Sequence, residues 1–213
     1  MKYTLGILLV ATTLVSTNAA ANDFVKPIQN TKIQYSYSEI LPEAIFHCPF
    51  SRGSAVDNIE LVEALARIEK EYDLPHDLRG MLMAAACHES GYNPLARGDH
   101  RFSKVKKAKA IGLFQMWPWW EKYYKIDRTD PLASARAYME HIKKSLKKIK
   151  KQCRYKNERK AWLAAWATAI RTPKKTGRCG ERPKFYRILN RWHNSIEEER
   201  KLIREYEQSV PGC

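Results

Sequence analysis

The first candidate for chemistry is Glu89, which follows apolar residues at helical spacing. Leu78, Leu82 and Ala85 step by four and three, and four further positions lead to Glu89. This spacing places the carboxylate on the buried stripe of a helix that we expect over residues 77–90, in its last turn. Lost hydration and the partial negative charge of a helix C-terminus both favour the protonated carboxyl and raise its pKa. A carboxyl that keeps its proton near neutral pH suits a general acid, for example in glycosidic bond cleavage.

Another interpretation of Glu89 is structural. A glutamate at a helix end often turns to solvent or pairs with a lysine, and this chain contains many lysines. Periodicity alone favours this structural interpretation.

Asp99, in the run Gly98-Asp99-His100, is a possible second acid. Inverting glycosidases place a second carboxylate roughly 6.5–9.5 Å from the first, where it activates water. An aspartate next to glycine also serves simply as a turn former. The aromatic residues Trp117, Trp119 and Trp120 are candidates for stacking on sugar rings or for the core.

The sequence predicts neither a metal site nor a cofactor. No Cys-x-x-Cys pair occurs, which argues against a zinc site and a thioredoxin-type redox site. His88 precedes Glu89, but no second histidine follows at the spacing of a His-Glu-x-x-His zinc motif.

Two short motifs resemble those of a known enzyme family. Residues 89–94 read Glu-Ser-Gly-Tyr-Asn-Pro, and residues 112–116 read Gly-Leu-Phe-Gln-Met. In order and spacing they resemble the Glu-Ser and Gly-Leu-Met-Gln motifs of the soluble lytic transglycosylase domain, whose fold is shared with goose-type lysozyme. The resemblance covers about residues 75–195. It implies a mainly α, lysozyme-like domain with a small β-hairpin or loop region beside a cleft.

The resemblance also implies roles for individual residues. Glu89 would be the catalytic residue, and Asp99 would take the place of the helper acids of goose-type lysozymes. Ser90 would hold the carboxyl or cap its own helix. The other expected substrate-binding residues are Gln115, Met116, Trp166 and Tyr186.

Tyr186 has an alternative role, and residues 165–167 depart from the family motif. Tyr186 would hydrogen-bond Glu89 or the substrate, unless it is a core tyrosine. Where the family has Ala-Tyr-Asn, residues 165–167 read Ala-Trp-Ala, and the glycine that usually follows is absent. The replacement of Asn by Ala167 puts part of the sugar-binding wall in doubt.

Capping and turn signals define the helices that would position these residues. Asp57 and Glu60 form a capping box, and the helix that follows ends at the Asp-Leu-Pro run of residues 73–75. Gly91 would cap the helix that ends at Ser90. Residues 91–118 are typical of loop and hairpin. Asp130 and Pro131 begin a helix that runs to about residue 151, and further helices are expected over residues 159–171 and 183–207, the last with a break near Asn194.

The N-terminus predicts export. Lys2, an apolar stretch over residues 5–15 and the alanines of residues 19–21 form a cleavable signal peptide over residues 1–21. Its apolar part is shorter than the about 20 residues that span a bilayer, although an N-terminal anchor helix is the alternative. The remaining regions are an N-terminal extension over residues 22–56, the catalytic domain over residues 57–195 and a helical tail over residues 196–213. We expect a periplasmic or secreted monomer with no transmembrane segment.

The chain is strongly basic, with 38 Lys and Arg against 23 acidic residues and a net charge of +15. Such a surface attracts polyanions. Outside the cytoplasm these are wall polymers, lipopolysaccharide and lipid headgroups, whereas nucleic acid is not expected. One face of the helix over residues 130–151 is either simply solvated or a docking surface for such polymers; it carries Lys143, Lys144, Lys147, Lys148 and Lys151.

Five cysteines in an exported chain predict disulfides and one cysteine left over. Cys87 lies among alanines in a predicted helix, and we expect it to be the buried free thiol. Cys153 and Cys179 flank one helical segment and would pair. Cys48 and Cys213 would then tie the N-terminal region to the C-terminus.

Three functions fit these observations. The first is a lytic transglycosylase that cuts the bond between N-acetylmuramic acid and N-acetylglucosamine in peptidoglycan and leaves 1,6-anhydro ends. The second is a hydrolytic lysozyme on the same fold. The third is a non-catalytic protein that binds the cell wall through a degenerate cleft.

Overall fold

The computed structural model describes residues 37, 48–49, 59–102, 107–169, 179 and 183–209. The chain divides into two units, Met1–Lys32 and Ile33–Cys213, and every described residue belongs to the second. The expected signal peptide, most of the N-terminal extension and Asp57 of the capping box lie outside the described residues.

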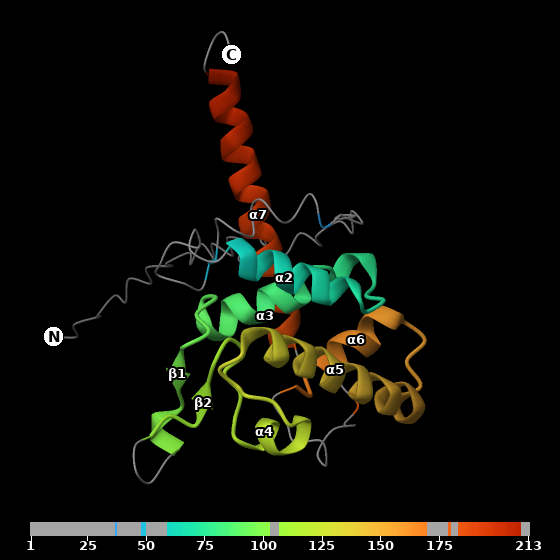
Figure 1. Cartoon of the computed structure of the whole chain (residues 1–213). Coiled ribbons are helices and arrows are strands. Elements are labelled where there is room, and N and C mark those ends of the chain that lie inside the picture. Colours follow the sequence, from blue (N-terminus) through green and yellow to red (C-terminus); the bar gives the residue numbers. More distant parts are fainter. Residues whose placement is uncertain are drawn as a thin grey trace, which may run out of the picture. The chain divides into compact units, whose positions relative to one another are not determined.

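The described part is mainly helical, as the sequence predicts (Figure 1). Its elements, in chain order, are α2 (Ile59–Lys70), the 3-10 helix η2 (His76–Leu78), α3 (Met81–Ser90), β1 (Arg97–Gly98), the 3-10 helix η3 (His100–Phe102), β2 (Ala110–Ile111), α4 (Trp119–Tyr124), α5 (Pro131–Cys153), α6 (Glu158–Trp166) and α7 (Pro183–Ser209). No helix among them is both long enough and apolar enough to cross a membrane.

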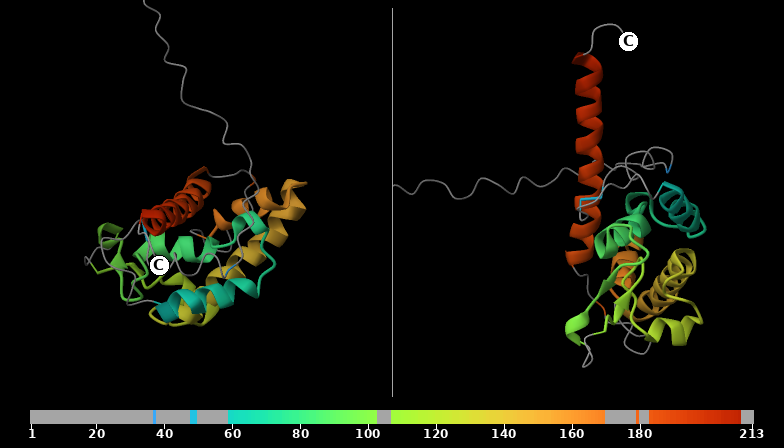
Figure 2. Two further views of the ribbon diagram at one scale, coloured as in Figure 1. Left: turned by 90° about the horizontal axis from the view of Figure 1, so that it is seen from above. Right: turned by 60° about the vertical axis from the view of Figure 1, so that its left-hand side comes forward.

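Helix α3 is the centre of the core. Every side chain from Met81 to Cys87 is buried, so the helix has no solvent-facing side before its last turn. It packs against α2 and α7, while α5 packs against α2 and α6 (Figure 2). A helix that is apolar on all sides requires such cover from its neighbours.

The start of α3 differs from the prediction. The helix begins at Met81 rather than near residue 77, because Gly80 adopts a left-handed conformation at φ 87°. The preceding residues form the separate 3-10 helix η2. The N-terminus of α3 is capped from another helix, since the Glu69 carboxylate of α2 accepts hydrogen bonds from the backbone N–H groups of Gly80 and Leu82, both at 2.6 Å. Sequence signals near α3 could not indicate this distant cap.

A two-stranded antiparallel hairpin confirms the second part of the predicted fold class. Arg97 pairs with Ile111, and Gly98 pairs with Ala110. A further bridge between Ile111 and Met116 folds the chain back after β2. The hairpin lies beside the C-terminal end of α3 (Figure 1).

Helix α5 agrees closely with its sequence signals. The Asp130 side chain accepts hydrogen bonds from the N–H groups of Leu132 and Ala133, and Pro131 occupies the first turn. The predicted stripe is buried: Tyr138, Ile142, Leu146 and Ile149. Short helix α4, which precedes α5, was not expected.

Helix α7 is one continuous helix, so the expected break near Asn194 is wrong. Helix α6 is capped by the side chain of Asn157, which accepts from Lys160 N–H. On α7 the buried positions extend as far as Ile196, and all side chains of residues 201–209 are exposed.

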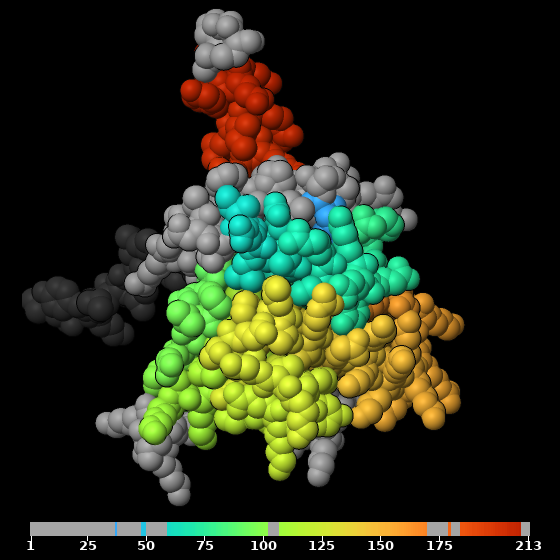
Figure 3. All heavy atoms as spheres, in the orientation of Figure 1, coloured from blue at the N-terminus to red at the C-terminus, as the bar shows by residue number. Residues whose placement is uncertain are grey.

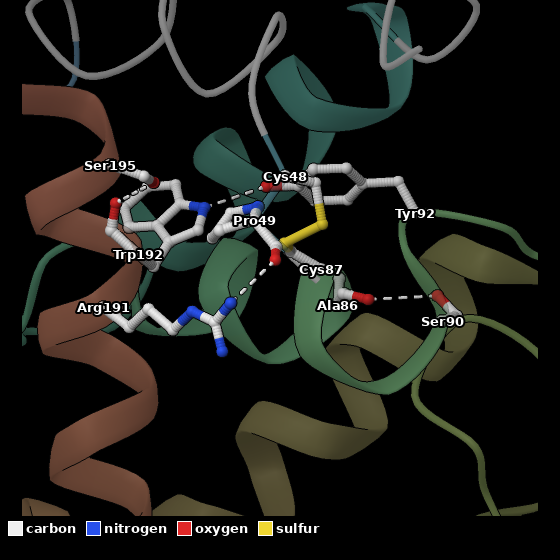
Figure 4. Close-up of a disulfide and its surroundings, with 9 residues drawn as sticks. All are labelled: Cys48, Pro49, Ala86, Cys87, Ser90, Tyr92, Arg191, Trp192 and Ser195. Carbon is white, nitrogen blue, oxygen red and sulfur yellow. Dashed lines mark hydrogen bonds between the residues drawn. A yellow bond between two sulfur atoms is a disulfide. The ribbon is translucent and has the colours of Figure 1, made fainter. Parts of the chain in front are cut away.

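Two disulfides fit a protein of an oxidising compartment. Cys153 pairs with Cys179, as predicted. Cys48 pairs with Cys87, so Cys87 is not a free thiol and the expected link between Cys48 and Cys213 is wrong (Figure 4). Burial of Cys87 in an alanine-rich helix did not exclude a partner from the extension. Cys213 lies outside the described residues.

Candidate active site

Glu89 lies in the last turn of α3, which is closed by local hydrogen bonds. Gly91 is left-handed, as predicted for a cap, and its N–H donates to the carbonyl of Cys87 at 2.8 Å. The Ser90 hydroxyl donates to the carbonyl of Ala86 at 3.0 Å (Figure 4). Ser90 therefore caps its own helix, the second of the two roles considered for it.

The Glu89 carboxyl is partly buried, and its pKa is raised above the usual value. Burial is the main cause, the negative charge of Asp99 acts in the same direction, and the positive charge of Lys184 opposes both. Within the described part of the chain, no hydrogen bond or ion pair fixes this carboxylate. The group is therefore disposed to hold a proton and is free to give it away.

The reason for this burial differs from the one suggested by the sequence. Because α3 is buried on all sides as far as Cys87, a stripe through Leu82 and Ala85 does not distinguish one face of the helix. The surroundings of Glu89 come instead from the hairpin and from α7, which supply Asp99 and Lys184.

Asp99 follows β1 and is held in place by a tryptophan. Its backbone is left-handed at φ 56°, and its Oδ2 accepts a hydrogen bond from Trp117 Nε1 at 2.8 Å. The Lys109 ammonium lies 5.4 Å from the centre of the Trp117 ring. The charge of Asp99 therefore acts on Glu89 and contributes to its raised pKa.

The two sequence motifs lie side by side. Gly112 N–H donates to the carbonyl of Ala96 at 2.9 Å, and the Gln115 side chain donates to the same carbonyl at 3.1 Å. The Gln115 side chain also donates to Gly112 at 3.0 Å. Gln115 therefore fastens the second motif to the segment that follows the first, which is a structural role in addition to the expected contact with substrate.

Gly112 explains why the second motif starts with glycine. Its φ is 78°, and a Cβ atom there would lie 2.0 Å from the carbonyl oxygen of Arg128. The buried Arg128 guanidinium donates to the carbonyls of Lys109 and Met116 at 2.9 and 2.7 Å, and pairs with Glu121 at 2.9 Å. Any side chain at position 112 would displace the Arg128 backbone, and with it the guanidinium that holds the hairpin.

Burial corrects two of the expected substrate contacts. Met116 and Trp166 are each 1% exposed, which leaves no surface for a sugar. Trp166 Nε1 donates to the Tyr138 hydroxyl at 2.9 Å, and the charge of Glu89 acts on that hydroxyl. Trp166 therefore supports the site through Tyr138. Ala167 is buried as well, and places no polar group beside the site.

Tyr186 lies in a different place from the one expected. Its ring lies under the Arg159 guanidinium at 4.6 Å, and its hydroxyl hydrogen-bonds Asn190. Lys184, two residues earlier on α7, acts on Glu89, and positions two apart on a helix point about 200° away from each other. The expected hydrogen bond from Tyr186 to Glu89 therefore has no support.

The tryptophans divide between core and surface. Trp120 is buried and stacks on Trp119 at 4.4 Å and on Tyr124 at 5.3 Å. Trp117 and Trp119 keep part of their surface exposed. Of the three candidates for sugar stacking, Trp117 is the one fixed to a site residue.

Two further features, the buried His141 and a cavity, do not involve Glu89. His141 is satisfied by the Tyr124 hydroxyl at 2.8 Å, and burial lowers its pKa to about 4. Among the described residues, no group of three His, Cys, Asp or Glu side chains could hold a metal. A cavity of about 540 Å³ contains none of the predicted site residues; it is lined by Tyr37, Lys70, Glu71, Tyr72, Asp73, Leu74 and Arg79.

Sequence reasoning missed Tyr138, Lys184 and Trp117 as neighbours of the acids. Tyr138 carried a signal, because a tyrosine on a buried stripe needs a partner for its hydroxyl. Lys184 carried no such signal, since its place depends on how α7 packs against α3.

Compared with known proteins, the chain matches no protein-family model, no curated protein and no solved structure.

Proposed function

We propose that the protein is an exported enzyme that cleaves the glycan strands of peptidoglycan, with Glu89 as the acid that protonates the glycosidic oxygen. We further propose a lytic transglycosylase that breaks the bond between N-acetylmuramic acid and N-acetylglucosamine. The signal peptide over residues 1–21, release into the periplasm or the medium, and a monomeric state belong to the same proposal.

The observation that carries this proposal is the setting of Glu89. Its carboxyl is partly buried, has a raised pKa and is not committed to an ion pair within the described residues. The second of the two motifs on which the family resemblance rests is also hydrogen-bonded to the segment directly after the first, because Gln115 and Gly112 both donate to the carbonyl of Ala96. A raised pKa in a general acid and a motif pair that meets in space are independent arguments for the same chemistry.

In the proposed reaction Glu89 first gives its proton to the oxygen of the leaving sugar. The resulting carboxylate then takes the proton of the C6 hydroxyl of the muramic acid, whose oxygen attacks C1. A 1,6-anhydro ring closes, and Glu89 regains its proton. Because the substrate supplies the nucleophile, this route needs no second carboxylate.

Hydrolysis is the second candidate, and the position of Asp99 favours it. The Asp99 side chain acts on Glu89 from the hairpin and accepts a hydrogen bond from Trp117, and in a hydrolase it would be the group that activates water. A hydrolase would leave reducing ends in place of anhydro ends.

One experiment distinguishes these functions. Purified mature protein is incubated with peptidoglycan sacculi, and the released sugar ends are identified by mass spectrometry. Anhydro ends support the transglycosylase, and reducing ends support the hydrolase. No release at any pH between 4 and 9 would leave a binding protein without catalysis.

The matched variants are Glu89→Gln and Glu198→Gln. The first keeps the shape of the side chain but cannot donate a carboxyl proton, so release should fall by at least about 100-fold. The second removes an exposed carboxylate of α7 and should leave release unchanged. Full activity of Glu89→Gln would show that Glu89 is not the general acid.

A further inference from the structure

Helix α5 presents a row of exposed lysines that the proposed reaction does not use. We call this row the lysine face; its members are Lys143, Lys144, Lys147, Lys148, Lys150 and Lys151. No acidic residue occurs between positions 143 and 153. The outer side of α5 forms part of the molecular face in Figure 3, between α2 and α4.

The lysine face points away from the candidate active site. Lys147 follows Tyr138 by nine residues, and at about 100° per residue the two side chains leave α5 in opposite directions. Tyr138 is buried toward Trp166 and Glu89. Lys147, in the middle of the lysine face, therefore lies on the side of α5 opposite to Tyr138, and the face forms a surface separate from the surroundings of Glu89.

Part of the lysine face has contacts within the described residues, since Lys143 lies 5.2 Å from the centre of the Tyr72 ring and Lys148 also has a contact. Lys150 pairs with Glu158 at 2.5 Å, and Lys144 lies 4.9 Å from the centre of the Tyr124 ring. Lys147 and Lys151, in contrast, have no acidic partner among the described residues. Both are exposed and lie one turn apart.

The C-terminal part of α7, in comparison, carries charges of both signs. There Arg200 pairs with Glu197, and Lys201 pairs with Glu205. On α5, Lys143, Lys147 and Lys151 follow one another at four-residue spacing, where like charges repel and destabilise a helix. A row of like charges that has few acidic partners among the described residues forms a concentrated positive surface, which attracts a partner of opposite charge.

We propose that the lysine face binds a linear polymer of the cell envelope that carries regularly repeated phosphate groups. Lys143, Lys147 and Lys151 rise along the helix by about 6 Å per step, which forms a line of charge suited to an extended chain. A bilayer surface fits less well, because interfacial binding also needs apolar side chains that enter the membrane. Among the described residues, the large exposed apolar side chain next to this face is Tyr123, 5.8 Å from the Lys144 ammonium.

This proposal goes beyond the proposed function, and it rests on that function only for the location of the polymer in the cell envelope. Since Lys147 and Tyr138 lie on opposite sides of α5, a polymer on the lysine face does not occupy the surroundings of Glu89. The bound polymer would hold the protein near its substrate without taking part in the reaction.

The test compares two double variants of the mature protein that lose the same charge. Lys147→Gln with Lys151→Gln alters the lysine face, and Lys201→Gln with Arg204→Gln alters the exposed part of α7. Binding to long-chain inorganic polyphosphate is measured by fluorescence anisotropy at several salt concentrations. We expect about 30-fold weaker binding for the first variant and a salt slope reduced by roughly 1.5. The second should change affinity by less than about threefold, since only long-range charge is lost.

Equal losses in the two variants would mean that net charge alone attracts the polymer, and no loss in either would also overturn the proposal. Vesicles of phosphatidylglycerol form a second arm. Binding to them that is tighter than to polyphosphate and depends on Lys147 and Lys151 would assign the surface to a bilayer instead. Circular dichroism and thermal unfolding verify that both variants fold, and the Glu89→Gln protein should bind polyphosphate like the wild type.

Discussion

At the scale of single residues, Glu89 is governed by two charged neighbours that act in opposite directions. Asp99 on the hairpin favours its protonated form, and Lys184 on α7 favours its ionised form. If Glu89 is the general acid, activity is present below its pKa and is lost as the pH rises through it. The position of this alkaline limb therefore reports the balance between the two neighbours.

Replacing either neighbour should move that limb. Asp99→Asn removes a negative charge but can still accept the hydrogen bond from Trp117, so the limb should move to lower pH. Lys184→Gln removes the opposing positive charge, so the limb should move to higher pH. Rates of sugar release measured from pH 4 to pH 9 verify both directions, and movement of both limbs in the same direction would contradict this assignment.

Sequence reasoning singled out two carboxylates as candidates but could not predict their surroundings. Glu89 and Asp99 were found from local motifs, and the structure brings them within reach of each other's charge. The proposed contacts of Met116, Trp166 and Tyr186 required knowledge of which side of each helix is buried. Burial depends on packing between distant elements, so local spacing could not predict these contacts.

At the scale of elements, the central helix α3 depends on a buried acid from another helix. The Glu69 carboxylate is fully buried and accepts hydrogen bonds from two N–H groups of α3 and from the Tyr37 hydroxyl at 2.8 Å. Burial outweighs these three bonds and raises the pKa of Glu69 from 4.5 to about 7. The folded state therefore binds a proton more tightly than the unfolded state.

This raised pKa makes a prediction for stability. The contribution of Glu69 is fully present below pH 4.5 and is lost as the pH rises through about 7. Glu69→Gln cannot titrate, so the wild type should lose on the order of 3 kcal/mol relative to this variant between pH 4.5 and pH 8. Urea unfolding at both pH values measures the difference, in which the effects of the buried histidines cancel. A difference that is independent of pH would contradict the raised pKa.

The two disulfides offer a matched pair of variants. They close loops with sequence separations of 39 and 26 residues, so the removal of either should cost roughly 3–4 kcal/mol of stability. Cys48→Ala with Cys87→Ala also frees the turn that leads to Glu89, and it should lower the turnover rate even below the unfolding temperature. Cys153→Ala with Cys179→Ala should leave turnover unchanged. Equal turnover in both variants would show that the disulfide between Cys48 and Cys87 does not influence the candidate active site.

Prediction of the elements succeeded where the signals are local. Asp130 and Pro131 begin α5, and Gly91 ends α3, because caps are set by nearby residues. The start of α3 was misplaced because its cap comes from Glu69. The partner of Cys87 was missed because it belongs to the extension.

At the scale of the whole molecule, the core ends partway along α7. Trp192 is fully buried and donates a hydrogen bond to the Tyr92 hydroxyl at 3.3 Å (Figure 4). Farther along the helix, Leu202 and Tyr206 are 60% and 70% exposed. One continuous helix thus joins a part that stabilises the core to a part outside it.

Variants on the two sides of this boundary should differ sharply. A stop codon in place of Lys201 should change the free energy of unfolding by less than about 1 kcal/mol, since exposed side chains contribute little. Trp192→Ala should cost about 3–5 kcal/mol, because it opens a cavity between α3 and α7. Thermal and urea unfolding measure both. A large loss on truncation would show that the end of α7 is covered.

The disulfide between Cys48 and Cys87 also has a consequence for where the protein reaches its final structure. A newly made chain among reducing thiols keeps both sulfurs apart, so the extension is not yet joined to the turn before Glu89. Oxidation after departure from the cytoplasm would make that connection. Under the proposed function, the protein would therefore lack this disulfide inside the cell that synthesises it, and would form it only after crossing the membrane.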